Sequence, residues 1–571
     1  MLYGFCNLFH LQEARMSQQF NLSTVFRTVA TTVPEQEVLV WRDRRLTYRE
    51  LDARADGLAH FLVEQGLGCH AERDTLAGHE SGQDHVGLYL RNGNEYLEGM
   101  LGSYRARATA INVNYRYVEE ELAYLLTDAA ATALVYHAEF APRVAAIRER
   151  LPRLRVLVQV ADESGNDLLP GAVDYESVLG TPAPAAGMPE PSPDDLFVLY
   201  TGGTTGMPKG VLWRQDDIYV TSMGGTPFGT TEPHASYDAI AEAARAAGGG
   251  MTLLMALPFM HGAAQWSTFH TITNGGKIVL PHHVDHLDAA DVLSTAIREK
   301  AVSIPVVGDA VVRPLIDEIE RGDYDLSGLA AINNGSAPLT PAVRDRFLEL
   351  APHMIVMDAA GSSETGLQMS SMSLKGMGAD AATFAPVPTT TVVDDLFTRV
   401  LAPGEGGGWL AQRGRVPLGY LGDAAKTART FPVIGGERFS IPGDRADLLE
   451  DGRIRLLGRD GVTINSGGEK IFVEEVERAL AHHPAVRDVV VVGRPSERWG
   501  SEPVAVVQLA EGASVTDEEL LATCAEHVAR YKVPRAVVRV GLVERSPSGK
   551  ADYRWAKTQA TAPGQAQPAP A

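Results

Sequence analysis

The chain has 571 residues, of which 45% are hydrophobic and 22% charged, as in soluble globular proteins that are large enough to form several cores. Its 51 Lys and Arg against 72 Asp and Glu give a formal net charge of -21, so the surface field repels polyanions and nucleic acid is not expected as a partner. Cys6, Cys69 and Cys524 lie too far apart for a CxxC metal site and are odd in number for a disulfide framework. A reducing, cytoplasmic location is expected.

No apolar run is long enough to cross a bilayer, and we expect no membrane span. The first residues lack a basic region before a brief apolar stretch that soon meets Glu13, which argues against a secretory signal; Met16 is an alternative start. We interpret residues 1–20 as an N-terminal extension. The segment 558–571 is rich in Ala, Pro and Gln, and we expect it to be a disordered tail.

The pattern along the chain predicts an α/β fold. Thr47 and Glu50 form a capping pair before a helix that places Leu51, Ala55 and Leu58 on one face. Short apolar runs predict strands, and helical stretches separate them. The runs are 196–200, 251–257, 277–280 and 354–357, and the helical stretches include 287–300 and 341–350.

After Gly458 the pattern changes to that of a smaller α+β unit. It predicts a helix at 473–482, strands near 488–492 and 503–509, a helix at 517–530 and a strand near 536–540. Earlier in the chain, the polar stretch 69–85 contains three histidines, but their spacing is irregular. We therefore expect a solvated loop there rather than a metal site.

The segment TGGTTGMPKG, from Thr201 to Gly210, follows the apolar run 196–200 and suits phosphate. Glycines let backbone N–H groups approach an anion, the hydroxyls add donors, and the lysine adds charge. It is not a Walker A loop, because Pro208 precedes the lysine and no Ser or Thr follows it. A flexible surface turn is the alternative. The residues that would contact phosphate are Thr201, Gly202, Gly203, Thr204, Thr205, Gly206 and Lys209.

This segment resembles the phosphate loop of the adenylate-forming superfamily, which includes acyl-CoA synthetases. Further similar segments follow in the same order, and together they cover the chain from about residue 20 to 557. They are PFMHG (258–262), NGSAP (334–338), GSSETG (361–366), PGD (442–444), GRDGVTINSGGEKIFVEEVE (458–477) and SPSGKADYRW (546–555).

The resemblance implies a large multi-subdomain N-terminal α/β domain and a small mobile α+β C-terminal domain. We place the ATP- and acyl-binding domain at 21–458, a hinge at 459–461 and the C-terminal domain at 462–557. Gly458 and Gly461 flank Arg459 and Asp460, and their backbone freedom suits a hinge.

Adenylation brings a carboxylate to the α-phosphorus of ATP, so the site must neutralise charge on both reactants. By resemblance, Lys550 bridges the two and is the catalytic lysine, while Glu364 and the Thr201 hydroxyl bind Mg²⁺. Without the resemblance, a lysine near the chain end and a glutamate in a loop would both be expected on the surface.

The resemblance also assigns the nucleotide site. Asp444 accepts from the ribose hydroxyls and Arg459 adds donors to the same sugar. The family usually has Thr where this chain has Ser363 and an aromatic where it has Ala360, so adenine is expected to pack on apolar atoms and on the turn 335–338. The further residues assigned to ATP or AMP are Gly335, Ser336, Ala337, Pro338, Gly361, Ser362, Lys470 and Lys550.

His261 resembles the gate between the nucleotide and acyl pockets, although a lone histidine on an apolar segment is also a common core residue. Gly224, Gly225 and Gly361 are assigned with it to the acyl pocket, with a plain glycine turn as the alternative for the first two. Gly467 and Gly468 are assigned to CoA binding.

The sequence is most similar to synthetases for steroid side-chain or polycyclic terpenoid acids, so we expect a bulky hydrophobic acid, ATP, Mg²⁺ and CoA. Long-chain fatty acids are the competing substrates. The sequence also leaves open an acyl-AMP ligase that loads a carrier protein, an amino-acid-activating enzyme and a non-enzymatic nucleotide sensor. It does not fix the oligomeric state, and a homodimer stays open.

Overall fold

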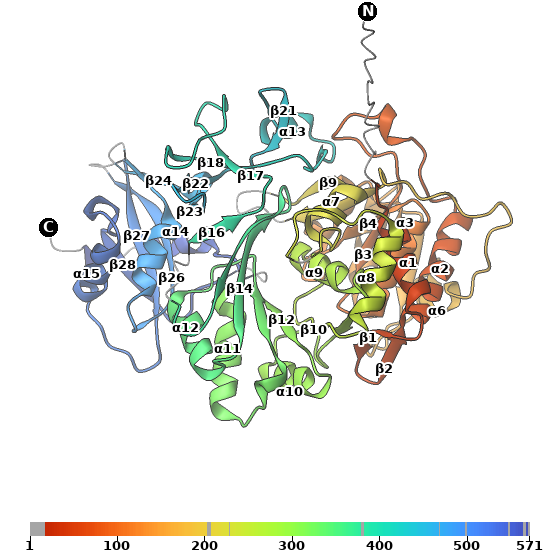
Figure 1. The fold of residues 1–571 in the computed structure, drawn as a ribbon, viewed down its shortest axis with the longest axis horizontal. Coiled ribbons are helices and arrows are strands. Elements are labelled where there is room, and N and C mark those ends of the chain that lie inside the picture. Colours follow the sequence, from red (N-terminus) through yellow and green to blue (C-terminus); the bar gives the residue numbers. More distant parts are fainter. Residues whose placement is uncertain are drawn as a thin grey trace, which may run out of the picture.

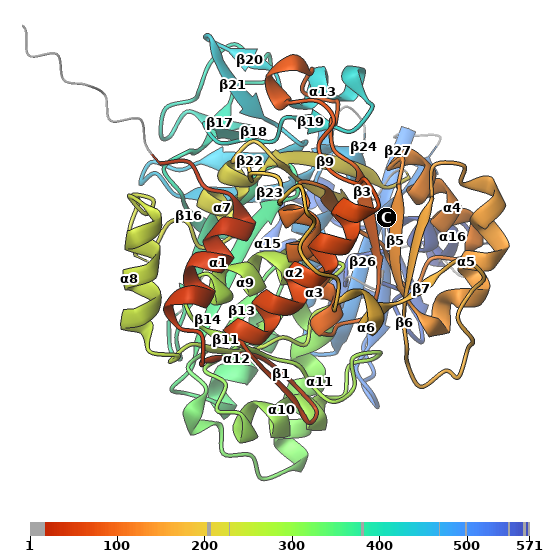
Figure 2. The same ribbon diagram turned by 90° about the vertical axis from the view of Figure 1, so that its right-hand side faces the viewer.

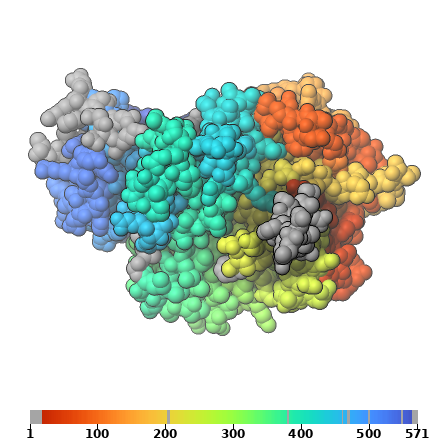
Figure 3. Space-filling view, turned by 45° about the horizontal axis from the view of Figure 1, so that its top comes forward, coloured from red at the N-terminus to blue at the C-terminus, as the bar shows by residue number. Residues whose placement is uncertain are grey.

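A computed structural model describes residues 18–201, 207–227, 229–377, 382–466, 469–496, 500–545, 549–562 and 567–568. It has a mixed α/β fold with a large N-terminal and a small C-terminal domain (Figure 1). The space-filling view shows the first and last parts of the chain at opposite ends of the molecule (Figure 3). Among the described residues, no helix is both long and apolar enough to pass through a membrane.

One sheet of the large domain carries the strand that leads to the phosphate loop. Its strands follow the order β19-β9-β8-β4-β3-β5-β6-β7, and those from β8 to β7 pair in parallel. The phosphate-loop strand β8 forms an antiparallel hairpin with β9. The bounds are β3 His85–Tyr89, β4 Thr109–Asn112, β5 Ala133–His137, β6 Val156–Val160, β7 Val173–Asp174, β8 Leu196–Thr201, β9 Lys209–Arg214 and β19 Gly419–Tyr420.

The other large sheet is parallel from β1 to β14, whereas β2 at one edge and the strands from β15 onward pair antiparallel. Its order is β2-β1-β11-β10-β12-β13-β14-β15-β16-β23-β22-β18-β21-β20, and β17 pairs with β18. The bounds are β1 Glu37–Trp41, β2 Arg44–Thr47, β10 Thr252–Leu254, β11 Lys277–Val279, β12 Ser303–Val306, β13 Ala331–Asn334, β14 Ile355–Ser362, β15 Gly366–Ser373, β16 Thr383–Pro386, β17 Thr390–Val393, β18 Gly406–Arg413, β20 Val433–Ile434, β21 Glu437–Ser440, β22 Asp444–Leu448 and β23 Ile454–Arg459.

Helices cover these sheets and bury their apolar faces. The helix expected after Thr47 is α2, and its capping box with Glu50 is present as predicted. Figure 2 shows α1, α2 and α3 side by side. The bounds are α1 Leu22–Thr32, α2 Tyr48–Glu64, α3 Asn94–Arg105, α4 Glu119–Asp128, α5 Ala141–Ile147, α6 Tyr175–Val178, α7 Gln215–Ser222, α8 Tyr237–Ala247, α9 Gly262–Ile272, α10 Ala289–Arg298, α11 Gly308–Arg321, α12 Pro341–Leu350 and α13 Ala424–Thr430.

The C-terminal domain has the α+β pattern that the sequence predicts after Gly458. Helices α14 and α15 pack on one face of its main sheet, which has the strand order β26-β27-β28-β29. The bounds are β24 Ile464–Ser466, β25 Glu469–Ile471, α14 Val473–Ala481, β26 Val486–Ser496, β27 Gly500–Leu509, α15 Asp517–His527, β28 Ala536–Val540, α16 Tyr553–Thr561 and β29 Gln567–Pro568.

Both chain ends differ from the expectation. Phe20, assigned to the N-terminal extension, is fully buried, and its backbone N–H donates to Asp216 at 2.9 Å. Helix α16 runs to Thr561, so residues 558–561 are helical rather than disordered. Ala560 is buried against the main sheet of the C-terminal domain, and alanine has the highest helix propensity, so this part of the segment forms a packed helix.

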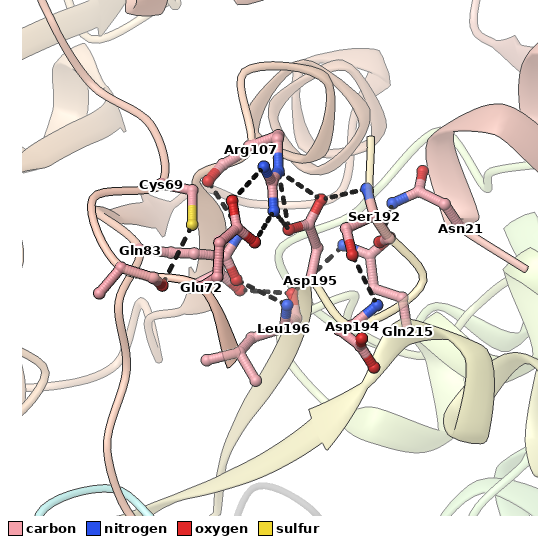
Figure 4. A network of polar contacts seen from close by, with 12 residues as sticks. Asn21, Cys69, Glu72, Gln83, Arg107, Ser192, Asp194, Asp195, Leu196 and Gln215 are labelled. Carbon is pink, nitrogen blue, oxygen red and sulfur yellow. Dashed lines mark hydrogen bonds and ion pairs between the residues drawn. The ribbon is translucent and has the colours of Figure 1, made fainter. Parts of the chain in front are cut away.

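A polar network holds the end of β8 that is remote from Thr201 (Figure 4). Arg107 donates to Asp195 at 2.9 Å and to Glu72 at 2.8 Å, and Asp195 is only 2% exposed. The backbone N–H of Leu196 donates to Gln83 at 2.6 Å. The predicted loop 69–85 supplies two of these partners and contains a short turn of 3-10 helix and an isolated bridge; its last residue, His85, is buried and begins β3. Its polar side chains therefore anchor a strand.

Candidate active site

The hairpin of β8 and β9 carries the two described ends of the phosphate loop. Thr201 ends β8 and Lys209 begins β9, and the two residues are cross-strand partners. The Lys209 ammonium lies 3.6 Å from a carboxylate oxygen of Asp423. The other residues predicted to contact phosphate, Gly202, Gly203, Thr204, Thr205 and Gly206, lie outside the described residues.

Glu364 lies in the tight connection between β14 and β15. Its Oε1 accepts a hydrogen bond from the Tyr420 hydroxyl at 2.8 Å, and its backbone oxygen accepts from the Ser440 hydroxyl at 2.6 Å. A Cβ at Gly361 would overlap the carbonyl oxygen of Gly366, so this close pairing of strands requires glycine. The carboxylate and hydroxyl oxygens of Glu364 and Thr201 are donors that suit Mg²⁺.

The predicted adenine wall consists of the turn after β13 and the neighbouring strand β14. Ser336 in the turn has φ +66°, a left-handed conformation that is uncommon for a residue other than glycine. Asn334 holds the turn, because its amide donates to Ala337 O at 3.1 Å and its carbonyl oxygen accepts from Gly308 N at 2.7 Å. Strands β13 and β14 pair in parallel, which brings the turn beside the segment that contains Ala360.

The two residues assigned to ribose meet directly. Asp444 begins β22 and Arg459 ends β23, and they are cross-strand partners. Arg459 Nε donates to Asp444 Oδ1 at 3.0 Å. The Asp444 carboxylate is the main reason that the pKa of Arg459 is raised. One oxygen of Asp444 is thus held by Arg459, which fixes the orientation of the carboxylate.

Lys550 reaches the same region from the C-terminal domain. Burial and the positive charge of Arg459 lower the pKa of Lys550, while Glu364 and Asp444 oppose that shift. All three are therefore within electrostatic range of its ammonium group. Gly549, directly before Lys550, packs on the large domain, since a Cβ there would lie 2.8 Å from Val307 Cγ1. The structure brings Lys550 together with Glu364, Asp444 and Arg459.

The connection between the domains is close to these residues. Gly458 has φ +142°, and a Cβ there would overlap a carboxylate oxygen of Glu474 in α14. Residues 460–462, which include the end of the predicted hinge, form a turn of 3-10 helix. Gly467 and Gly468 lie outside the described residues; the backbone of Lys470 is in β25, opposite Asn465, and its side chain is not described.

His261 is the N-cap residue of α9, without a capping hydrogen bond from its side chain, and it is half-buried. Burial first, and then the charges of Arg116 and Lys550, lower the pKa of His261 to about 4, so the ring is neutral at physiological pH. Its Nε2 has no hydrogen-bond partner among the described residues. An unpartnered ring nitrogen within electrostatic range of Lys550 is consistent with a position facing the reacting groups.

Close packing accounts for Gly224 and Gly225, which the sequence assigns to the acyl pocket. A Cβ at Gly224 would lie 2.8 Å from the side chains of Thr273 and Asn274, and one at Gly225 would lie 2.7 Å from Val220 Cα. These positions face neighbouring protein atoms, as expected of a tight glycine turn. Their role in the acyl pocket stays a prediction.

Sequence reasoning missed the residues that hold the Glu364 loop in place. Tyr420 and Ser440 contact Glu364, and the Trp213 indole donates to Ser363 O at 2.8 Å. No local pattern marks Tyr420 or Ser440, which are 56 and 76 residues from Glu364 in sequence. Asn334 could have been found, because it opens the NGSAP segment and an Asn before a Gly commonly stabilises a turn.

Comparisons with known families agree with this arrangement. The profile of the AMP-binding enzyme family matches residues 26–421, and that of the AMP-binding enzyme C-terminal domain matches residues 475–550. Two curated relatives span nearly the whole chain. The medium-chain acyl-CoA ligase Mig of Mycobacterium avium is 58% identical over 95% of this chain and 98% of its own length. The 3-oxocholest-4-en-26-oate--CoA ligase of Rhodococcus rhodochrous is 40% identical over 94% and 96%.

A solved structure shows the same fold. The anthranilate CoA ligase AuaEII, in complex with anthranoyl-AMP, aligns with a TM-score of 0.78 and 22% sequence identity. The alignment covers 95% of this chain and 98% of that protein. At this identity the similarity concerns the fold, which confirms the expected α/β architecture with two domains.

Proposed function

Because the chain belongs to the AMP-binding enzyme family, we propose that it joins a bulky hydrophobic carboxylic acid to CoA through an acyl-adenylate, consuming ATP and releasing AMP and pyrophosphate. Its nearly full-length relatives are acyl-CoA ligases. The observation that carries the proposal is that Lys550 lies within electrostatic range of Glu364, Asp444 and Arg459, although the four residues come from separate segments of the chain.

The charges in this cluster suit the first half of the reaction. Two anions must meet when a carboxylate attacks the α-phosphorus of ATP, and a partly desolvated ammonium group stabilises the negative charge that develops. Lys550 supplies this charge, Asp444 with Arg459 orients the nucleotide through its sugar, and Thr201 with Lys209 approaches the phosphates. Mg²⁺ held by Glu364 and Thr201 would neutralise phosphate charge when bound.

The second half requires CoA to reach the same carbonyl. Lys550 is within electrostatic range of Glu364, Asp444 and Arg459 in the present arrangement, and rotation of the C-terminal domain would make room for CoA before the thioester forms. The backbone at Gly458 provides a pivot, and contacts such as Arg487 with Asp317, 3.9 Å apart, have to break. This ion pair is half-exposed and therefore weak, which favours reversible docking.

The acid is proposed to be large and apolar, as in steroid side-chain acids. The Rhodococcus relative is named for such a substrate. The Mycobacterium avium relative is named a medium-chain acyl-CoA ligase, which makes a medium-chain acid the second candidate. A neutral His261 beside the reacting groups is compatible with either, because it adds no charge to an apolar pocket.

A panel of acids tests this proposal. The purified chain is incubated with ATP, Mg²⁺, CoA and one of octanoic, palmitic, octadecanoic, steroid side-chain or diterpenoid acid, and thioester and pyrophosphate are measured. We expect the highest kcat/KM with a polycyclic acid. A preference for octanoic acid would select the second candidate, and transfer only to a carrier protein would identify an acyl-AMP ligase. If none of the acids caused pyrophosphate release, the proposal would be refuted.

The location and assembly of the protein are proposals of the same kind. ATP and CoA as substrates, with Cys69 and Cys524 both free, support a cytoplasmic location. A homodimer is tested by light scattering during size-exclusion chromatography.

A further inference from the structure

Helix α13 places Lys426 next to residues of the candidate active site. The Lys426 ammonium lies 3.9 Å above the centre of the Tyr420 ring. The hydroxyl of that ring donates to Glu364 Oε1 at 2.8 Å. Tyr420 is 2% exposed, so one buried ring positions both the cation and the carboxylate.

Asp423 connects Lys426 with the phosphate hairpin. Its Oδ1 accepts a hydrogen bond from the backbone N–H of Lys426 at 2.9 Å. Its Oδ2 lies 3.6 Å from Nζ of Lys209, the lysine at the start of β9. Asp423 thus contacts the Lys209 side chain and the Lys426 backbone, and the two lysines are within electrostatic range of each other.

The balance of charge in this cluster depends on Lys426. Lys209 and Asp423 compensate each other, and Lys426 joins Arg459 and Lys550 in opposing the negative charge of Glu364. An added positive charge favours the binding of a polyanion. The Lys426 ammonium is partly buried, and no described residue accepts a hydrogen bond from its Nζ. Burial lowers the pKa of Lys426, and Glu364 opposes that shift.

We propose that Lys426 is a second phosphate-binding lysine, which with Lys209 receives the β- and γ-phosphates of ATP and holds pyrophosphate as it leaves. This inference rests on the proposed function. When the carboxylate oxygen bonds to the α-phosphorus, the bond from that phosphorus to the bridging oxygen breaks, and the electron pair goes to pyrophosphate. A cation close to this oxygen stabilises the charge that it gains.

The test compares ligands that contain these phosphates with one that lacks them. In Lys426→Met, which keeps an unbranched apolar stem, we expect the KM for ATP and the inhibition constant of pyrophosphate to rise about tenfold, the effect of losing about 1.4 kcal/mol. The inhibition constant of AMP should stay within about twofold. Calorimetric titration of ATP and AMP in EDTA measures the same difference without metal or turnover.

Three variants complete the experiment. Lys426→Arg should restore most of the ATP and pyrophosphate affinity, because it retains the charge. Arg429→Met removes an exposed charge from the same helix and should leave both constants unchanged. Lys426→Gln repeats the measurement should the Met variant fold poorly. In an active enzyme, the inference would be overturned if Lys426→Met left the KM for ATP and the inhibition constant of pyrophosphate unchanged, or if the affinity for AMP fell equally. A wild type that consumes no ATP with any acid would instead refute the proposed function.

Discussion

Asp444 and Arg459 face each other across β22 and β23, with Arg459 Nε donating to Asp444 Oδ1 at 3.0 Å. This pair ends the large domain, and Lys550 of the C-terminal domain is within electrostatic range of both residues. The groups proposed to orient the nucleotide and the proposed catalytic lysine thus depend on one docking arrangement.

Asp444→Asn should raise the KM for ATP about tenfold, because an amide loses the charge that binds Arg459 and one of its two acceptor oxygens. The KM for the carboxylic acid should change little. Initial rates at varied ATP and acid concentrations measure both constants. Asp451→Asn is the matched control, since Asp451 is exposed in the turn between the same two strands. An unaltered KM for ATP in Asp444→Asn would contradict the assignment of Asp444 to the nucleotide site.

Lys550→Ala should slow adenylation by roughly 100-fold or more, because the developing charge loses its ammonium partner. Thioester formation from supplied acyl-adenylate should be much less affected, as it uses another arrangement of the domains. Pyrophosphate release and single-turnover thioester formation report the two steps. Lys557→Ala, an exposed lysine on α16, serves as the control. Equal slowing of both steps would argue against this role for Lys550.

His261→Ala should weaken the use of the carboxylic acid more than the binding of ATP. The ring is within electrostatic range of Lys550. Because its Nε2 has no hydrogen-bond partner among the described residues, the substitution leaves no such partner unsatisfied. The KM for a series of acids and the Kd of ATP are to be compared with those of His286→Ala, which alters an exposed ring. An unchanged acid profile would contradict a gating role.

Glu477→Gln should stabilise the protein in alkaline solution. Burial, with a contribution from Glu474, raises the pKa of Glu477 from 4.5 to about 8, although the N–H of Val491 and the charge of Arg545 favour ionisation. Because the folded pKa is raised, the native carboxyl holds its proton. Its contribution is full below pH 4.5 and is lost as the pH rises through about 8.

Thermal melting from acidic pH to about pH 9 measures this effect. The Gln variant should lose less stability than the wild type over the upper part of that range, since an amide cannot ionise and still accepts from Val491 N at 2.8 Å. Glu518→Gln alters an exposed carboxyl on α15 and should follow the wild-type curve. Parallel curves for wild type and Glu477→Gln would show that Glu477 does not titrate in this way.

Local patterns in the sequence predicted much of the fold. The strand expected near 536–540 is β28 Ala536–Val540, and the helix expected at 473–482 is α14 Val473–Ala481. Each of these elements has its own hydrophobic periodicity, which determines its type and most of its length. The predicted start of the C-terminal tail was wrong, because burial of Ala560 depends on a distant sheet rather than on nearby residues.

The candidate site was predictable only where a motif carries it. Glu364, Asp444 and Lys550 each lie in a recognisable segment, and the structure brings them together. Tyr420 and Lys426 lie in no segment that was singled out, and they approach Glu364 because β19 pairs with β9 at the edge of the phosphate-loop sheet. Contacts that depend on sheet order have no local signature, so the sequence could not reveal them.

The network around Arg107 fixes only one end of β8, while the other end leads to the phosphate loop. Near the phosphate loop the same strand is held by Asn112, which bonds to both the N–H and the carbonyl oxygen of Tyr200. A substitution at Arg107 would therefore remove one of the two anchors of the strand that leads to the phosphate loop, without altering any residue proposed to bind ATP.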